Sequence, residues 1–101
     1  MEITTNIDES LAKIAVSGKL TVATSPELEK TIQGLPDTVS SIDIELTDLE
    51  YISSAGLRVL VTAQKLTTQR DGVLRLLHPA EDVYEVFEMT GLSEVITIVK
   101  G

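Results

Sequence analysis

The stretch DLEYISSAGLRVL, Asp48 to Leu60, says more about the fold and function of this chain than any other part of it. Apolar and acidic residues alternate over 42–46 and indicate a strand just before it, whereas a helical pattern begins at about Ala55. The adjacent serines Ser53 and Ser54 therefore lie at the N-terminus of a helix, shortly after a strand. Such a helix end carries unpaired backbone N–H groups and about half a positive charge, so it suits an anionic group such as a phosphate.

A serine at this position can cap the helix, act as a nucleophile or accept a phosphate. Either serine could be the cap, and replacing a serine cap with alanine typically costs about 1 kcal/mol. The run ISSAG also resembles half of the nucleophile elbow of hydrolases, with His78 as the candidate base and Asp48 nearby. Ile52 stands where that motif has its first glycine, so the sequence predicts a protein that is not an enzyme.

Composition narrows the class of partner. Sixteen acidic residues against eight basic ones leave a net charge of −8. This charge would repel nucleic acid and anionic membranes, so neither is expected to bind. The chain has no cysteine, no cluster of metal-ligating carboxylates and no phosphate-binding glycine loop, so we expect neither a metal nor a cofactor.

Length and hydropathy predict one soluble, cytoplasmic domain that spans residues 1–101. Hydrophobic residues make up 43% of the chain, which is enough for a packed core. The first residues lack the basic and apolar segments of a signal peptide. No segment approaches the roughly 20 apolar residues that are needed to cross a bilayer.

Periodicity outside the serine stretch predicts strands that alternate with helices. The first two strands are expected to form an antiparallel hairpin. Strands are expected at 3–7, 11–17, 41–46, 73–78 and 95–99, and helices at about 24–35, 55–70 and 79–90.

Capping residues set the expected helix ends. Thr24 or Ser25 starts the first helix, and Glu27 completes a capping box if Thr24 is the cap. Asp71-Gly72 stops the second helix, and Gly91 is the expected C′ residue of the third, with Leu92 folding back onto it. The third helix is expected to bury an apolar stripe made of Val83, Val86, Phe87 and Thr90.

This order, β-β-α-β-α-β-α-β, predicts an α/β fold with a mixed, mostly parallel sheet of about five strands. A sheet covered on both faces should show nearly continuous apolar strands. Here Asp43 and Glu45 alternate with apolar residues, and Lys13 and Arg75 take similar positions in other strands. We therefore expect the helices mainly on one face of the sheet and a wet surface on the other.

Three segments together resemble the anti-sigma factor antagonists of bacteria, the small STAS-domain proteins. GKLTVATSPEL at 18–28 matches the segment that leads into the family's first helix, and DLEYISSAGLRVL matches its serine-bearing loop. VYEVFEMTGL at 83–92 matches a later helix, with MTGL at its end. The resemblance covers nearly the whole chain and implies a STAS-like fold.

The resemblance further implies partner switching. In the family, the unmodified antagonist binds an anti-sigma factor that is a serine kinase of the GHKL type, and phosphorylation of one serine dissolves the complex. A PP2C-type phosphatase resets the switch. In this chain the phosphorylated serine falls on Ser54, with Ser53 as the alternate. Residues expected to contact the partner are Thr21, Asp48, Glu50, Ser53, Ser54, Gly56, Leu57 and Arg58.

The chain departs from the family's pattern at three positions in or beside this set. Ser53 stands where aspartate is frequent, Ala55 where a second hydroxyl is usual, and Thr21 where many members have an acidic residue. A STAS subunit of a larger assembly, such as a stress-sensing complex or a lipid-transport system, is the alternative function. If Ser54 is phosphorylated, we expect the fold to persist and the effect to fall on the partner surface, where Asp48 and Glu50 concentrate negative charge.

Overall fold

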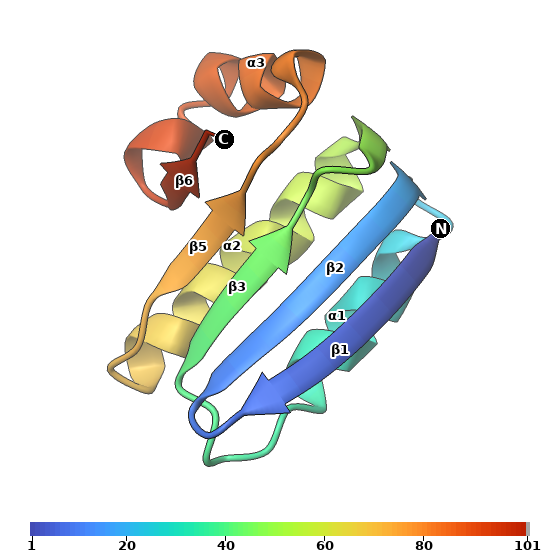
Figure 1. The fold of residues 1–101 in the computed structure, drawn as a ribbon. Coiled ribbons are helices and arrows are strands. Elements are labelled where there is room, and N and C mark those ends of the chain that lie inside the picture. Colours follow the sequence, from blue (N-terminus) through green and yellow to red (C-terminus); the bar gives the residue numbers. More distant parts are fainter. Residues whose placement is uncertain (101) are drawn as a thin grey trace.

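A mixed β-sheet forms the framework of the computed structural model, which describes residues 1–100 (Figure 1). The strands lie in the order β1-β2-β3-β5-β6, and β4 pairs separately with β2. This arrangement confirms the expected α/β fold with a mixed sheet. The elements are β1 (Glu2–Asp8), β2 (Leu11–Leu20), α1 (Ser25–Gln33), β3 (Ser41–Glu45), β4 (Leu49–Ile52), α2 (Ser54–Gln69), β5 (Leu74–Leu77), α3 (Glu81–Met89), the 3-10 helix η1 (Leu92–Glu94) and β6 (Thr97–Val99).

Strand pairing follows the expected chain directions. β1 and β2 form the predicted antiparallel hairpin, in register from Glu2 opposite Ser17 to Asp8 opposite Leu11. The pairs β2–β3, β3–β5 and β5–β6 are all parallel. Each parallel connection passes through a helix, as parallel pairing requires.

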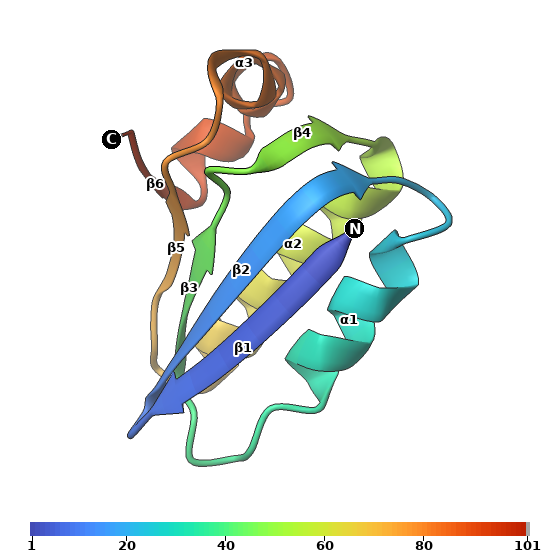
Figure 2. The same ribbon diagram turned by 45° about the vertical axis from the view of Figure 1, so that its right-hand side comes forward.

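Strand β4 differs from the sequence prediction, which places these residues in a loop. β2 is longer than predicted and continues past Gly18, where φ is +85°. The Gly18 N–H donates to the Asp48 carbonyl at 3.0 Å, and the Ser53 N–H donates to the Leu20 carbonyl at 2.8 Å. Figure 2 shows that β4 lies across the end of the sheet, beside the last residues of β2. This pairing fixes the backbone just before the serines.

Helices α1 and α2 cover one face of the sheet, as predicted (Figures 1 and 2). The buried stripe of α1 includes Leu28 and Ile32, and that of α2 includes Val59, Leu60 and Ala63. These side chains join the apolar residues of β2, β3 and β5 in one core. Helix α3 packs at the end of the sheet against β4 and η1.

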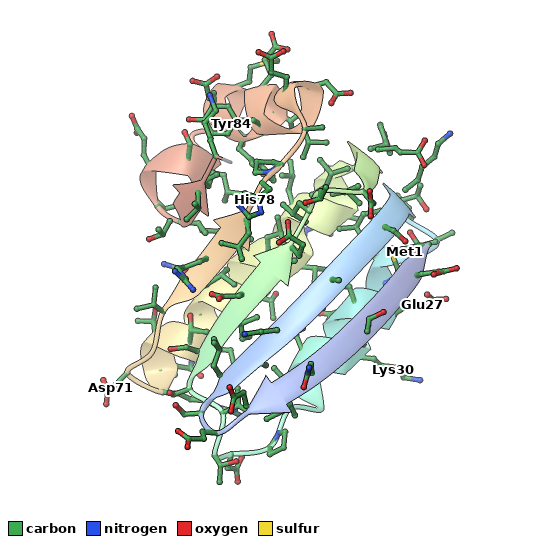
Figure 3. The ribbon with its side chains drawn as sticks, in the orientation of Figure 1. Met1, Glu27, Lys30, Asp71, His78 and Tyr84 are labelled. Carbon is green, nitrogen blue, oxygen red and sulfur yellow. The ribbon has the colours of Figure 1, made fainter. Side chains whose placement is uncertain are left out.

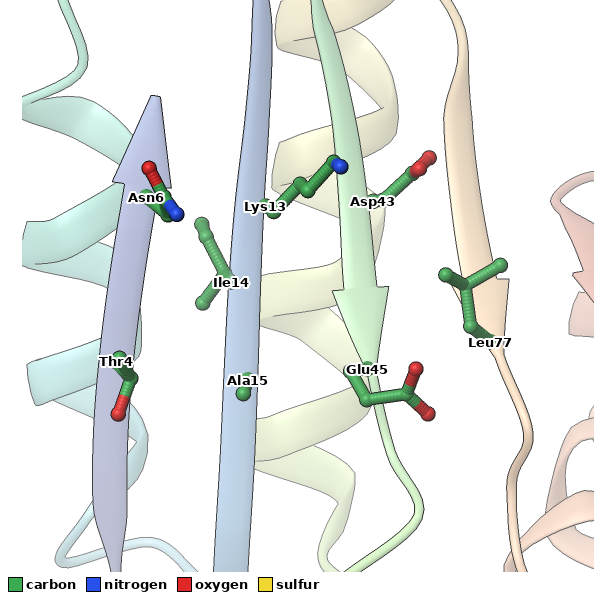
Figure 4. Close-up of a pocket in the computed structure, with 8 residues that line it drawn as sticks. All are labelled: Thr4, Asn6, Lys13, Ile14, Ala15, Asp43, Glu45 and Leu77. Carbon is green, nitrogen blue, oxygen red and sulfur yellow. The ribbon is translucent and has the colours of Figure 1, made fainter. Parts of the chain in front are cut away.

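The opposite face of the sheet is open and polar, which confirms the expectation of a wet surface. A cross-strand row runs through Asn6, Lys13, Asp43, Arg75 and Thr97. Arg75 donates from Nε and Nη2 to the two carboxylate oxygens of Asp43, and this hydrogen bonding raises the pKa of the guanidinium. A depression of about 390 Å³ lies along the face beside this ion pair (Figure 4).

Thr24 is the N-cap of α1, which confirms one of the two expected starts of this helix, but two details of the helix starts differ from the prediction. The Thr24 hydroxyl donates to the Lys19 carbonyl at 2.8 Å and accepts the Thr21 N–H at 2.8 Å, so it forms no capping box with Glu27. Helix α3 begins at Glu81 rather than near Pro79, because Ala80 is its N-cap.

The predicted ends of α3 and β6 agree only in part with the structure. Gly91 adopts φ +78° and Leu92 is buried, which confirms the expected C′ turn. Val86 is half-buried rather than buried, and Thr90 is exposed, with its hydroxyl donating to the Val86 carbonyl at 2.8 Å. Val95 ends the 3-10 turn, so β6 starts two residues later than expected.

Helix α2 ends in a Schellman motif, in which Asp71 takes the left-handed conformation with φ 58°. Gly72 serves a different purpose, since a Cβ there would lie 1.8 Å from the Ser40 carbonyl oxygen. No helix within residues 1–100 has the length and apolar character that a membrane span requires.

Candidate functional site

The two serines at the start of α2 have separate structural roles. Ser53 is the N-cap in an extended conformation, and its Oγ accepts the Gly56 N–H at 3.2 Å. Its carbonyl also accepts the Leu57 N–H at 2.9 Å, and its own N–H is bonded to Leu20. Ser53 is therefore held at both its backbone and its side chain, and it satisfies donors that the helix would otherwise leave unpaired.

Ser54 occupies the first helical position and is exposed. Within residues 1–100 its hydroxyl makes no hydrogen bond, because capping is completed by Ser53. The first turn of α2 also carries no acidic side chain that would offset the positive end of the helix dipole. The Ser54 oxygen is thus accessible to solvent, and an anion attached to it would be favoured by the helix dipole.

Gly56 permits the close approach of α2 to the sheet. It is buried, and a Cβ added to it would lie 2.8 Å from Ile52 Cγ1 and 2.9 Å from Leu20 Cδ2. The structure thus gives Gly56 a packing role and no accessible side for the partner contact that we expected there. Its neighbour Leu57 is half-buried against the core, whereas Arg58 is exposed.

The loop before α1 lies beside the serines, because the Leu20 carbonyl accepts the Ser53 N–H. Thr21 follows Leu20 and is half-buried; its Oγ1 accepts the N–H groups of Ala23 at 3.2 Å and Thr24 at 3.3 Å. Thr21 thus shapes this loop more than it presents a side chain to solvent.

A groove of about 210 Å³ runs between α1 and α2 and reaches Ala55, the residue after Ser54. Arg58 and Val22 both line it, and Val22 is 72% exposed. Val22 is not among the residues that the sequence predicts to contact a partner, because the groove that it lines arises only when α1 and α2 pack side by side. The other residues that line this groove are Ser25, Pro26, Glu29, Ala55, Val59 and Thr62.

Asp48 directly precedes β4 and Glu50 lies within it, and the two do not form one acidic patch. Asp48 is exposed in the turn before β4, and it lines a depression on the open side of the sheet with Glu2 and Glu45. Glu50 lines a different groove, between β4 and α3, together with Tyr51. The negative charge expected at the serines is therefore distributed over two sides of β4.

His78 directly follows β5, with φ 55° (Figure 3). Its side chain contacts Glu45. Its Nδ1 is 3.1 Å and 3.0 Å from the two carboxylate oxygens. Burial alone would raise the pKa of Glu45, but hydrogen bonds from Thr47 and His78 outweigh it, so this pKa lies below its usual value of 4.5. The carboxylate that His78 contacts is therefore Glu45, and not Asp48 as the catalytic-triad alternative would require.

Comparison with known families agrees with this fold. Residues 2–100 of the chain match the family model of the STAS domain. The chain belongs to the STAS domain family. Two curated relatives of this STAS domain are each called an anti-sigma-B factor antagonist. The protein from Staphylococcus aureus is 29% identical over 102 residues, which cover 100% of this chain and 94% of that protein. The protein from Bacillus subtilis is 29% identical over 91 residues, which cover 90% of this chain and 84% of that protein.

Solved structures show the same fold. The crystal structure of an anti-sigma factor antagonist from Mycobacterium paratuberculosis has a TM-score of 0.87 to this STAS domain at 20% sequence identity. The alignment covers 99% of this chain and 86% of that one. At this identity the likeness concerns the fold alone, so the function of the site has to be argued from its own residues.

Proposed function

We propose that this STAS domain is an anti-sigma factor antagonist that binds a GHKL-type serine kinase through the surface around the N-terminus of α2. The names of the S. aureus and B. subtilis relatives support the class of function. The proposal rests on the different structural roles of the two serines. Ser53 alone caps α2, which leaves Ser54 exposed and its hydroxyl unengaged within residues 1–100.

In the proposed reaction, Ser54 Oγ attacks the γ-phosphorus of ATP held by the kinase. The new O–P bond forms as the bond to ADP breaks, and the serine proton passes to a base of the kinase. The product carries about −1.5 to −2 charge at a helix end, where an exposed anion is favoured by about 0.3–1 kcal/mol. The modification should therefore leave α2 intact and act on the docked partner through bulk and charge.

A phosphatase of the PP2C type would reset the switch, because an exposed phosphoserine on the first turn of a helix is open to a second enzyme. The proposed setting is the bacterial cytoplasm, where kinase, phosphatase and ATP would meet. Neither step requires a cofactor held by this STAS domain, since ATP arrives with the kinase.

The test is to incubate the protein with ATP and each purified GHKL serine kinase of the source bacterium, followed by mass spectrometry. We expect one phosphate on Ser54, none on Ser54→Ala, and continued modification of Ser53→Ala. Ser54→Asp should weaken binding to the same kinase. Modification that persists in Ser54→Ala and is lost in Ser53→Ala would assign the site to Ser53 instead.

Co-purification separates this proposal from the alternative of a structural STAS subunit. A GHKL kinase that elutes with the tagged protein supports the antagonist. A permease, a transport ATPase or a large assembly of other STAS proteins that elutes with it instead would overturn the proposal.

A further inference from the structure

Arg58 stands four residues after Ser54 on the same exposed side of α2. Residues at this spacing are neighbours on a helix surface, with Cβ atoms about 5–6 Å apart. The Cα–Cβ bonds of a helix tilt toward its N-terminus, so a long side chain covers the turn before its own residue. The guanidinium of Arg58 therefore has Ser54 within its reach.

The orientation of this pair is the favourable one. An anion that precedes a cation by four residues is better placed than the reverse order, because it also lies nearer the positive end of the helix dipole. A phosphate on Ser54 would be such an anion. Arginine suits it particularly well, because its planar fork can donate two hydrogen bonds to phosphate oxygens.

Arg58 is also uncommitted in the unmodified protein. In the part of the chain that the structure describes, its guanidinium joins no ion pair. Arg70 and Arg75 are bound to Asp37 and Asp43. Lys100 lies elsewhere, with its Nζ 4.2 Å from the ring centroid of Tyr84.

We propose that Arg58 is a shared cation whose partner changes with the state of Ser54. In the unmodified protein the guanidinium, beside the groove between α1 and α2, is available to a carboxylate on the anti-sigma factor. In the modified protein the phosphate on Ser54 binds the Arg58 guanidinium as an internal counter-ion. Phosphorylation then weakens the complex twice, by adding negative charge and by withdrawing a positive contact. This inference rests on the proposed function.

The first experiment tests the internal contact without any kinase. Phosphoserine is installed at position 54 of the full chain during translation, and the phosphate is titrated by ³¹P NMR. In the parent protein its second ionisation constant should be about twofold larger than in Arg58→Gln, because Arg58 favours the dianion. The Nε–H signal of Arg58 should shift with the same midpoint.

Two charge-matched variants serve as controls. Lys65→Gln removes a cation from the same exposed helix side, but eleven residues from Ser54, which is about 16 Å along the axis. Lys19→Gln removes the exposed cation that pairs in register with Tyr51 of β4. Both should leave the ionisation of the phosphate unchanged. Equal ionisation in the parent and Arg58→Gln, or an equal effect of either lysine variant, would overturn the internal contact.

The second experiment measures the effect on the partner, with the kinase identified by phosphate transfer. Arg58→Gln should weaken binding of the unmodified protein about fivefold to tenfold, and phosphorylation should then reduce its affinity by a smaller factor than in the parent. An equal factor in both would overturn the shared role. If no kinase modifies Ser54, the proposed function fails, whereas the NMR result still decides whether phosphate and Arg58 interact.

Discussion

At the scale of single residues, the two adjacent serines differ in what removing their hydroxyl should do. Ser53→Ala deletes the N-cap of α2 and leaves the Gly56 N–H without its acceptor, so it should lower the free energy of unfolding by about 1 kcal/mol. Ser54→Ala removes an exposed hydroxyl without a partner and should change stability by less than about 0.5 kcal/mol. Urea denaturation of both variants measures this, and a larger loss for Ser54→Ala would contradict the assignment of the cap.

Glu45 should give the protein part of its resistance to acid. Its pKa in the folded state lies below 4.5, so the folded protein binds fewer protons there than the unfolded chain. The resulting stability is present above pH 4.5 and disappears as the pH falls through the lower folded value. Because Glu45 is partly exposed, its contribution should be at most about 1 kcal/mol.

Urea denaturation of the parent and Glu45→Gln at pH 6 and pH 3 tests this expectation. The variant should be less stable at pH 6, and the difference should shrink at pH 3. Thr47→Val removes the hydroxyl that donates to Glu45 and should reduce the same pH dependence. A difference that is the same at both pH values would show that Glu45 acts through packing alone.

At the scale of elements, periodicity predicted the hairpin, a mostly parallel sheet and the serine-bearing helix, because each element is long enough to show its repeat; the order of the strands was not predicted. It missed β4, in which the buried residues Leu49 and Ile52 enclose two exposed ones. That spacing lacks the two-residue period of a strand and is closer to the i, i+3 spacing of a helix, so it does not indicate a strand. The strand exists because the end of β2 beyond Gly18 offers it hydrogen bonds, and such long-range pairing leaves no local signal.

Two glycines that follow helices should respond differently to alanine, because one needs space and the other needs a left-handed backbone. Gly72→Ala places a Cβ 1.8 Å from the Ser40 carbonyl oxygen and should destabilise the protein by about 3 kcal/mol or more. In Gly91→Ala the added Cβ meets no atom within 4 Å. The loss of stability then comes only from holding alanine at a positive φ, which costs about 1 kcal/mol. Thermal melts compare them, and equal losses would show that crowding at Gly72 is relieved by backbone movement.

At the scale of the whole molecule, the sequence located the serine-bearing end of the sheet but not all of its surface. Ser54 and Arg58 could be placed because both lie in the recognisable stretch Asp48 to Leu60, about one helical turn apart. Val22 could not, since the groove that it lines arises only when α1 and α2 pack side by side. The separation of Asp48 from Glu50 was hidden for the same reason, because it depends on β4.

The open face of the sheet shows why the molecule can tolerate an added charge at one end. Its central ion pair is internal, since Arg75 binds both carboxylate oxygens of Asp43 within the sheet. The buried face consists of one apolar core that joins both helices to the strands. Neither region contains Ser54, so a phosphate there should disturb neither the core nor the ion pair.

The phosphorylated protein should therefore keep its fold. With phosphoserine installed at position 54, the melting temperature should stay within about 4–8 °C of the parent, which corresponds to about 1 kcal/mol for a domain of this size. Hydrogen–deuterium exchange should change only at the start of α2, in β4 and in the loop before α1. Phosphoserine at Ser10, exposed in the β1–β2 turn, adds the same charge at the other end of the sheet from Ser54 and serves as the control. Loss of protection in β3 or β5 for the Ser54 form alone would show that the switch unfolds the sheet rather than acting at its surface.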